Sequence, residues 1–177
     1  MNRQILILIT GLPGTGKTTF ALALAKQLQF AHFNSDMLRE ALGMKGRYDE
    51  ATKQLIYSTL LKRVEEALRQ GKSVIVDATF YKEHLRTPFQ QTAAQSEVPV
   101  MWIELRAAAP TIKERVGQER PYSEADYEVY LRIEKEYEPL DKRDLLFWTD
   151  QLTIPEMIEK TEAYLSSFTK SLPNEGR

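Results

Sequence analysis

A glycine-rich stretch near the amino end carries the clearest chemical signal in the sequence. Residues 11–18, GLPGTGKT, match G-x-x-x-x-G-K-[ST] between a predicted strand and a predicted helix. Glycines in such a loop let backbone N–H groups turn around a β-phosphate, and the amino end of the helix adds positive charge. We expect Lys17 to reach the β- and γ-phosphates of a nucleotide and Thr18 to ligate Mg²⁺. The predicted nucleotide-binding residues are Gly11, Leu12, Pro13, Gly14, Thr15, Gly16, Lys17, Thr18 and Thr19.

A carboxylate that could share this metal ion follows the third apolar run. The run Ser73–Asp77 ends on an acid, an arrangement that holds Mg²⁺ opposite the hydroxyl of a phosphate loop. The alternative interpretation of Asp77 is a turn residue at a strand end. Ala78 follows, so the chain lacks the Asp-Glu pair whose second carboxylate positions hydrolytic water. Transfer to a bound acceptor is therefore favoured over motor-like ATP hydrolysis.

The end of the second predicted strand, Asn34–Arg39, could form an acceptor site. It lies at the same carboxyl edge as the phosphate loop, where ligands of open α/β sheets bind. Asp36 could accept the proton of an attacking hydroxyl, and Arg39, one helical turn later, could bind an acceptor phosphate or carboxylate. The alternative is that Ser35 or Asp36 only caps the next helix and that Arg39 is a solvated surface charge.

Composition and missing motifs exclude several classes of protein. The 177 residues include no cysteine, which excludes disulfides and thiolate metal sites, and the net charge of −1 gives no general attraction to polyanions. The asparagines are only Asn2, Asn34 and Asn174, so the guanine-reading Asn-Lys-x-Asp of GTPases is absent. The longest apolar run, Ile5–Ile9, is too short to span a bilayer, and no signal-peptide cleavage site follows it. We expect a cytoplasmic protein that binds no membrane.

Short apolar runs alternate with longer segments of helical spacing, which predicts an α/β protein with three layers: a five-stranded, mostly parallel sheet with helices on both faces. The predicted strands are Gln4–Thr10, Ala31–Asn34, Ser73–Asp77, Val98–Leu105 and Asp144–Thr149. The predicted helices are Lys17–Leu28, Asp36–Leu42, Glu50–Gln70, Lys82–Gln95, Pro110–Val116, Glu124–Tyr137 and Pro155–Phe168. We expect residues 1–168 to form one domain, with a helical lid at about 112–137, and residues 169–177 to form a flexible tail.

These motifs, in this order, resemble the small P-loop kinases of the polynucleotide kinase and chloramphenicol phosphotransferase type, often described as AAA-type ATP-binding proteins. The resemblance implies phosphoryl transfer from ATP, with Asp36 matching the candidate base of the family. It also implies an arginine-bearing lid that neutralises the transferred phosphate, a role that Arg115 and Arg120 match. The family commonly spaces these arginines four apart, whereas position 119 is Glu here. The alternative for both arginines is a solvated helix face.

Three acceptors remain open at this point. A small molecule with a hydroxyl group leads, and a nucleic-acid 5′-hydroxyl comes second. Residues 124–138 carry a net charge of −4, from six acids against Arg132 and Lys135, which disfavours a long nucleic-acid groove there. A nucleoside monophosphate is third, because Asp36–Arg39 also resembles the Asp-Met-Leu-Arg of adenylate kinases. A module that binds ATP and hydrolyses it slowly is the alternative to a kinase, and the oligomeric state is not predicted.

Some conspicuous residues are left outside the predicted site. Isolated histidines are more often packed or solvated than catalytic, so His32 and His84 receive no role. Trp102 and Trp148 lie in apolar strands and are expected to belong to the core.

Overall fold

The computed structural model describes residues 4–118 and 127–171. Its five-stranded sheet is parallel throughout, with strand order β2-β3-β1-β4-β5. The strands are β1 (Leu6–Thr10), β2 (Ala31–Asn34), β3 (Val74–Asp77), β4 (Val100–Arg106) and β5 (Leu145–Trp148). The helices are α1 (Lys17–Leu28), α2 (Ser35–Ala41), α3 (Glu50–Arg69), α4 (Glu83–Gln95), α5 (Ala109–Val116), α6 (Tyr127–Lys135) and α7 (Ile154–Ser171). The predicted α/β architecture is confirmed.

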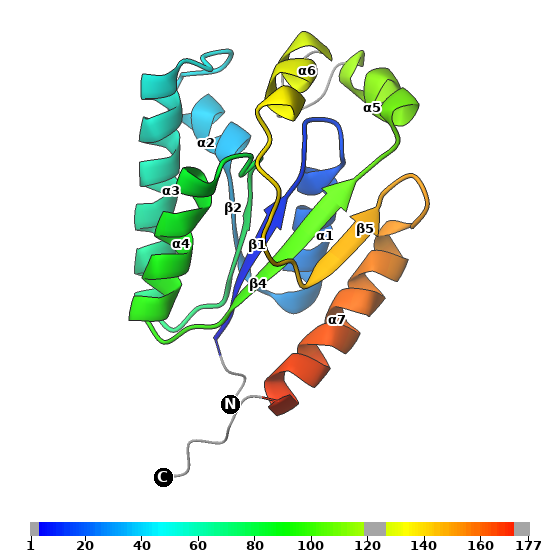
Figure 1. Ribbon diagram of the computed structural model, residues 1–177. Helices are drawn as coiled ribbons and strands as arrows, with labels where there is room; N and C mark the ends of the chain where they lie inside the picture. Colours follow the sequence, from blue (N-terminus) through cyan, green and yellow to red (C-terminus); the bar gives the residue numbers. More distant parts are fainter. Residues whose placement is uncertain (1–3, 119–126, 172–177) are drawn as a thin grey trace.

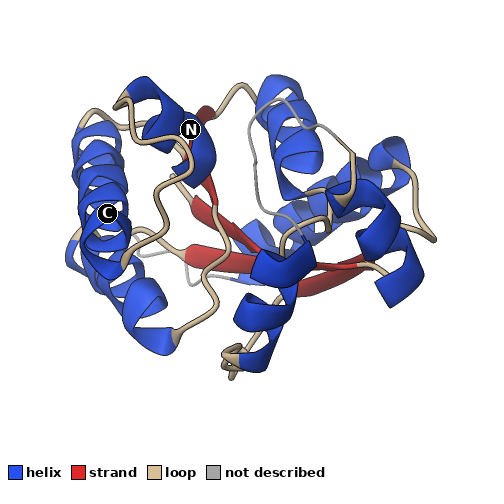
Figure 2. Cartoon of the chain, turned by 90° about the horizontal axis from the view of Figure 1, so that it is seen from above, coloured by secondary structure: helices blue, strands red, loops and turns tan. Residues whose placement is uncertain are grey.

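The central strand β1 shows how alternating side chains build the layers. All five of its residues are buried, as expected for a strand that is covered on both faces. Leu6 and Leu8 pack in the hydrophobic cluster under α3 and α4, whereas Ile7 and Ile9 pack in the cluster under α1 and α7. The helix pairs lie on opposite faces of the sheet in Figure 1, and Figure 2 shows the same layers from above.

The helix α3 packs through the stripe that its sequence predicts. Ile56, Leu60, Val64 and Leu68 recur at i+4 and are all buried against the sheet. The chain leaves the helix through Gly71, whose φ of +77° is the left-handed conformation expected at a helix end. The amino end of α3 is thereby held at the edge of the sheet where the phosphate loop lies.

Two short helices stand over the carboxyl ends of the strands (Figure 1). Ile112 and Val116 of α5 pack with Tyr130 of α6, and Leu12 of the phosphate loop adds to this small cluster. The contact places α5 and α6, which belong to the predicted lid, directly above the loop. The predicted lid residue Arg120 lies outside the described residues.

Several element bounds differ from the prediction by one to three residues. The strand β1 begins at Leu6 rather than Gln4, and β4 covers Val100–Arg106 rather than Val98–Leu105. Residues 169–171 were expected to be part of a flexible tail, but α7 continues through Ser171. The predicted end of this helix at Phe168 is therefore three residues too early, because polarity alone does not end a helix. Within the described residues, no helix is long and apolar enough to cross a membrane.

Candidate active site

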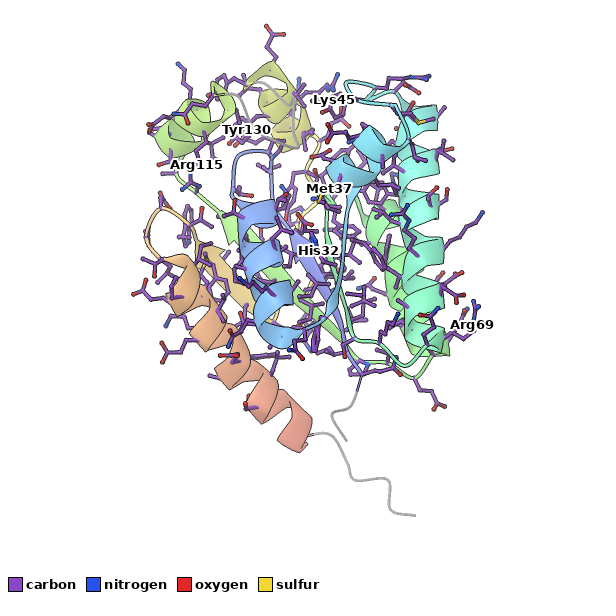
Figure 3. All side chains as sticks on the ribbon, turned by 180° about the vertical axis from the view of Figure 1, so that it is seen from behind. His32, Met37, Lys45, Arg69, Arg115 and Tyr130 are labelled. Atoms are coloured by element: carbon purple, nitrogen blue, oxygen red, sulfur yellow. The ribbon has the colours of Figure 1, made fainter. Side chains whose placement is uncertain are left out.

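A cavity of about 780 Å³ opens at the carboxyl edge of the sheet. Its walls are the phosphate loop, the amino ends of α2 and α3, the segment after β3, part of α6, and residues 149–154. Figure 3 shows Met37, Arg115 and Tyr130 at this end of the molecule and Arg69 at the opposite end of α3. The cavity therefore occupies the position where open α/β sheets bind their ligands.

The phosphate loop adopts a backbone that its glycines permit. Gly16, directly before α1, has a φ of +84°, and Gly11 has a φ of +152°. A Cβ atom at Gly11 would lie 2.4 Å from the carbonyl oxygen of Leu105, so a larger residue cannot fit without moving the backbone. Lys17 Nζ donates a 3.0 Å hydrogen bond to the carbonyl oxygen of Leu12, which holds the ammonium group against the loop.

The two predicted metal ligands lie in contact at the end of α1 and β3. The Thr18 hydroxyl donates a 2.9 Å hydrogen bond to Asp77 Oδ2, and the Asp77 side chain is fully buried. These hard oxygen donors fit Mg²⁺, which keeps several water ligands and needs only one or two from the protein. Thr18 and Asp77 are therefore the residues that would hold the ion.

The strand β2 adds two side chains to this pair that sequence reasoning did not include. Asn34 Nδ2 donates to Asp77 Oδ2 at 2.7 Å and to the Thr18 hydroxyl at 3.1 Å. His32 Nε2 lies 2.6 Å from Asp77 Oδ1. His32 was expected to be merely packed or solvated, and this contact depends on the pairing of β2 with β3, which no local pattern reveals.

Asp36 and Arg39, the residues of the predicted acceptor site, form an ion pair in the wall of the cavity. Arg39 is only 6% exposed, so the alternative of a solvated surface charge is wrong. The helix cap is also not Ser35 or Asp36, because Asn34 Oδ1 accepts the 2.7 Å hydrogen bond from Met37 N. Asp36 is thereby left to face the cavity.

Burial raises the pKa of the Asp36 carboxyl group above its ordinary value. The positive charges of Arg39 and Lys17 oppose the rise, and the negative charge of Asp77 adds to it. The carboxyl group thus lies close enough to Lys17 of the phosphate loop and to Asp77 for their charges to shift its pKa. A raised pKa suits a group that takes up a proton near neutral pH.

Arg39 also contacts an aromatic ring. Its guanidinium lies 4.7 Å from the centre of the Tyr48 ring, a cation–π contact. Arg39 Nε is buried and makes no hydrogen bond within the described part of the chain. Because a buried N–H group without a partner is costly, this atom could donate to a bound acceptor.

Side chains from α3 and from the segment after β3 complete this part of the cavity wall. Lys53 Nζ donates to the Tyr81 hydroxyl at 2.5 Å and to Glu50 Oε2 at 3.1 Å. Tyr57, one turn after Lys53, accepts a 3.1 Å hydrogen bond from Phe80 N. Burial raises the pKa of Tyr57 well above its usual range, so its hydroxyl group stays protonated. Lys53, Tyr57 and Tyr81 all line the cavity.

Arg115 links α5 to the phosphate loop and to the loop after β5. Its guanidinium donates to the Thr149 hydroxyl at 2.8 Å, to the Thr149 carbonyl at 3.2 Å and to the Gly14 carbonyl at 3.3 Å. The Thr149 hydroxyl in turn donates to the Thr15 carbonyl at 3.0 Å. Sequence reasoning missed Thr149, which no motif marks. Arg115 lies in the cavity wall, beside the phosphate loop rather than on a solvated helix face.

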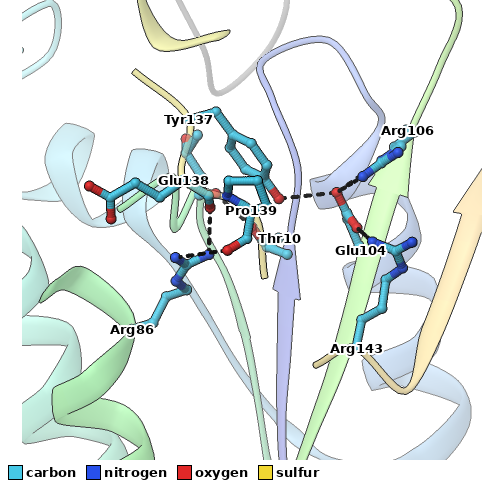
Figure 4. A network of polar contacts seen from close by, with 9 residues as sticks. Thr10, Arg86, Glu104, Arg106, Tyr137, Glu138, Pro139 and Arg143 are labelled. Carbon is cyan, nitrogen blue, oxygen red and sulfur yellow. Dashed lines mark hydrogen bonds and ion pairs between the residues drawn. The ribbon is translucent and has the colours of Figure 1, made fainter. Parts of the chain in front are cut away.

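A polar network around the buried Glu104 side chain fixes the segment that follows α6 (Figure 4). Glu104 on β4 is 3% exposed, and its carboxylate accepts hydrogen bonds from Arg106 Nε at 2.9 Å, Arg143 Nη1 at 2.9 Å and the Tyr137 hydroxyl at 3.0 Å. Arg86 Nη1 on α4 donates to the Glu138 carbonyl at 2.9 Å. These bonds anchor the segment directly after α6 to β4 and α4.

A curated relative is the L-seryl-tRNA(Sec) kinase of Methanococcus maripaludis, which is 30% identical to this chain over 108 residues. The aligned region covers 58% of this chain and 41% of the relative. The chain therefore spans less than half the length of the curated relative that it matches.

Several solved structures share the fold over nearly the whole chain. The APS kinase of Mycobacterium tuberculosis, in complex with AMPPNP and APS, superposes with a TM-score of 0.71 at 18% identity, covering 94% of this chain and 99% of that chain. A gluconokinase from Sinorhizobium meliloti has a TM-score of 0.70 at 14% identity, with 96% of both chains covered. Kti12 of Chaetomium thermophilum, in complex with ADP-AlF3, has a TM-score of 0.68 at 19% identity and covers 90% and 98%.

These likenesses confirm the predicted fold, that of the small P-loop kinases, with the phosphate loop between β1 and α1. Residues 6–140 match the family model described as an AAA domain, a span that runs from β1 past α6. The chain belongs to this AAA domain family.

Proposed function

We propose that the protein transfers the γ-phosphate of Mg·ATP to a hydroxyl group of a small molecule held beside Asp36. The observation that carries this proposal is the placement of the phosphate loop, Thr18 and the Asp36–Arg39 ion pair around one cavity, with Asp77 hydrogen-bonded to Thr18. The relatives described above as kinases, one of them bound to AMPPNP, support the same class of reaction.

The nucleotide would lie along the phosphate loop, with its triphosphate against the loop N–H groups and Lys17. Thr18 and Asp77 would hold Mg²⁺, which when bound neutralises charge on the β- and γ-phosphate oxygens. Arg115 lies beside the loop, where its guanidinium can stabilise charge on the phosphates. We infer the same role for Arg120 from the family resemblance.

In the transfer step, the acceptor oxygen forms a bond to the γ-phosphorus while the bond from that phosphorus to the bridging oxygen of ADP breaks. The proton of the attacking hydroxyl group moves to the Asp36 carboxylate. Lys17 and the lid arginines compensate the charge that develops on the bridging oxygen. Arg39 orients Asp36 and offers a donor to the acceptor.

A hydroxyl acceptor fits Asp36 better than a nucleoside monophosphate does. The attacking oxygen of a monophosphate is already charged and has no proton to give up, so a carboxylate beside it would only repel it. A nucleic-acid 5′-hydroxyl has the required chemistry. However, Glu134, Glu136 and Glu138 would oppose a long phosphate backbone near the end of α6.

The test is a panel of acceptors incubated with Mg·ATP, with ADP release and phosphorylated acceptor both measured. The panel contains sugars, sugar acids, nucleosides, nucleoside monophosphates, hydroxylated antibiotics and 5′-hydroxyl oligonucleotides. Wild type is compared with Asp36→Asn and Lys17→Ala. The control Asp49→Asn changes an exposed acid that caps α3, and asparagine caps helices equally well.

We expect one acceptor class to raise ADP release and to become phosphorylated. Asp36→Asn should abolish this stimulation while ATP binding survives, and Lys17→Ala should weaken both. If no acceptor is phosphorylated and Asp36→Asn hydrolyses ATP at the wild-type rate, the transfer proposal is wrong. The slow ATP-hydrolysing binding module then takes its place.

A further inference from the structure

The carboxylate of Asp77 is held by more side chains than the sequence motif contains. His32 and Asn34 stand two residues apart on β2 and reach across to it from the same face of the strand. His32 Nε2 contacts Oδ1 at 2.6 Å, whereas Asn34 Nδ2 and the Thr18 hydroxyl share Oδ2. Figure 3 shows His32 on β2, below Met37 of α2. Both oxygens of a fully buried carboxylate are thus paired.

The side-chain amide of Asn34 forms hydrogen bonds through both its oxygen and its nitrogen. Its oxygen accepts from Met37 N at 2.7 Å, which caps the helix that carries Asp36 and Arg39. That backbone N–H can only donate, so it fixes which end of the amide is oxygen. The nitrogen must then face Asp77, where it donates at 2.7 Å. The buried Asn34 side chain therefore connects Thr18 and Asp77 to α2, the helix that carries Asp36 and Arg39.

We propose that His32 and Asn34 are positioning residues, which aim the Asp77 carboxylate at Mg²⁺, and that Asn34 also couples the metal site to α2. The proposal rests on the proposed nucleotide site. Without the His32 donor, Oδ1 would be buried without a partner, and the carboxylate would turn to find one. Hydrogen-bonding partners behind a ligand typically change metal affinity by about 10- to 100-fold.

A purely structural role would predict something different. Loss of packing at β2 would weaken nucleotide binding equally with and without metal. A positioning role changes only the part of the affinity that depends on Mg²⁺. The decisive quantity is therefore the ratio of AMPPNP affinity in Mg²⁺ to that in EDTA, measured by calorimetry, with no turnover needed.

The variants distinguish the effect of losing a hydrogen-bond donor from the effect of losing side-chain volume. His32→Phe keeps a ring but removes the N–H, and His32→Gln restores a donor. Asn34→Ser can still cap α2 through its hydroxyl oxygen but is too short to donate to Asp77. The control is His84→Phe, an exposed position on α4.

We expect the Mg²⁺-to-EDTA affinity ratio to fall roughly 10-fold or more in His32→Phe and Asn34→Ser. His32→Gln should recover much of the ratio, and His84→Phe should keep all of it. A wild-type ratio in His32→Phe, or no Mg²⁺ dependence in the wild type, would overturn the proposal. If the ratio behaves as expected while no acceptor is ever phosphorylated, the positioning role stands and the transfer reaction alone fails.

The coupling has its own readout in hydrogen exchange at the backbone of residues 35–41. In the wild type, Mg·AMPPNP should slow exchange in both the phosphate loop and α2, because Asn34 links them. In Asn34→Ser we expect the loop to remain protected and α2 to lose at least half of its ligand-dependent slowing. Equal slowing of α2 in both proteins would contradict the coupling.

Discussion

The strongest prediction concerns the proton acceptor. Asp36→Asn removes the carboxylate but keeps the side-chain size and one oxygen that can accept from Arg39, so the fold should survive. A positioned general base contributes about 10²- to 10⁴-fold to a rate. At about 1.36 kcal/mol for each factor of ten, the barrier to transfer should rise by about 2.7 to 5.4 kcal/mol. Nucleotide affinity should change little, because Asp36 lies on the acceptor side of the cavity.

The pH dependence of transfer tests the same group in a second way. Asp36 accepts a proton only when it is ionised, so kcat/KM should fall as pH falls through the raised pKa of this carboxyl group. The Arg39 charge lowers that pKa, so Arg39→Met should raise it further. The acid limb of the profile must then move to higher pH in Arg39→Met.

The assay is initial-rate phosphorylation of the acceptor found in the panel, from about pH 4 to 9. The Asp49→Asn control should leave the acid limb in place, since this acid lies at the start of α3 and caps it. The reasoning is refuted if Asp36→Asn keeps more than about a tenth of wild-type turnover. It also fails if Arg39→Met leaves the acid limb where it was.

Further predictions concern two cations that line the cavity and two glycines with positive φ angles. Arg115→Ala removes the bonds to Thr149 and to the phosphate loop, so AMPPNP affinity measured by calorimetry should fall roughly 10-fold or more. Gly11→Ala should lower the free energy of unfolding by more than about 3 kcal/mol in urea titrations, because strain adds to the clash. Gly43→Ala should cost only about 1 kcal/mol, because no atom lies near its Cβ position. Lys53→Met should raise the acceptor KM at least about threefold and leave the ATP KM unchanged, since the Lys53 ammonium group lines the cavity and hydrogen-bonds to Tyr81 and Glu50 rather than to the phosphate loop.

Local patterns were sufficient to predict the frame of the molecule. Apolar runs bounded by turns gave the strands to within two residues at each end, because buried strands need continuous apolar sequence. The phosphate loop was predictable because its spacing encodes backbone geometry within one segment. Asp36 and Asp77 could be proposed because the carboxyl ends of parallel strands share one edge of the sheet.

The contacts between segments could not be predicted in this way. His32 meets Asp77 across 45 residues of sequence, and Arg115 meets Thr149 across 34. Each contact depends on the register of two strands or on the docking of a helix onto a loop, and a single sequence contains no local signal for either. An isolated histidine in a short strand looks the same whether it packs in a core or supports a carboxylate.

The register of the sheet connects stability to the site. Asp77 is the Cα partner of both Ile9 on β1 and Asn34 on β2, so β2 and β3 end at one level and β1 ends one residue later. Ile75 packs on the α1 side, and Asp77, two residues later, points to the same side, where it contacts Thr18 in the first turn of α1. A slip of one residue would turn Asp77 toward α3 and α4 and would also expose the wrong apolar face to each layer. The apolar alternation that stabilises β3 therefore also aims the metal carboxylate at the phosphate loop.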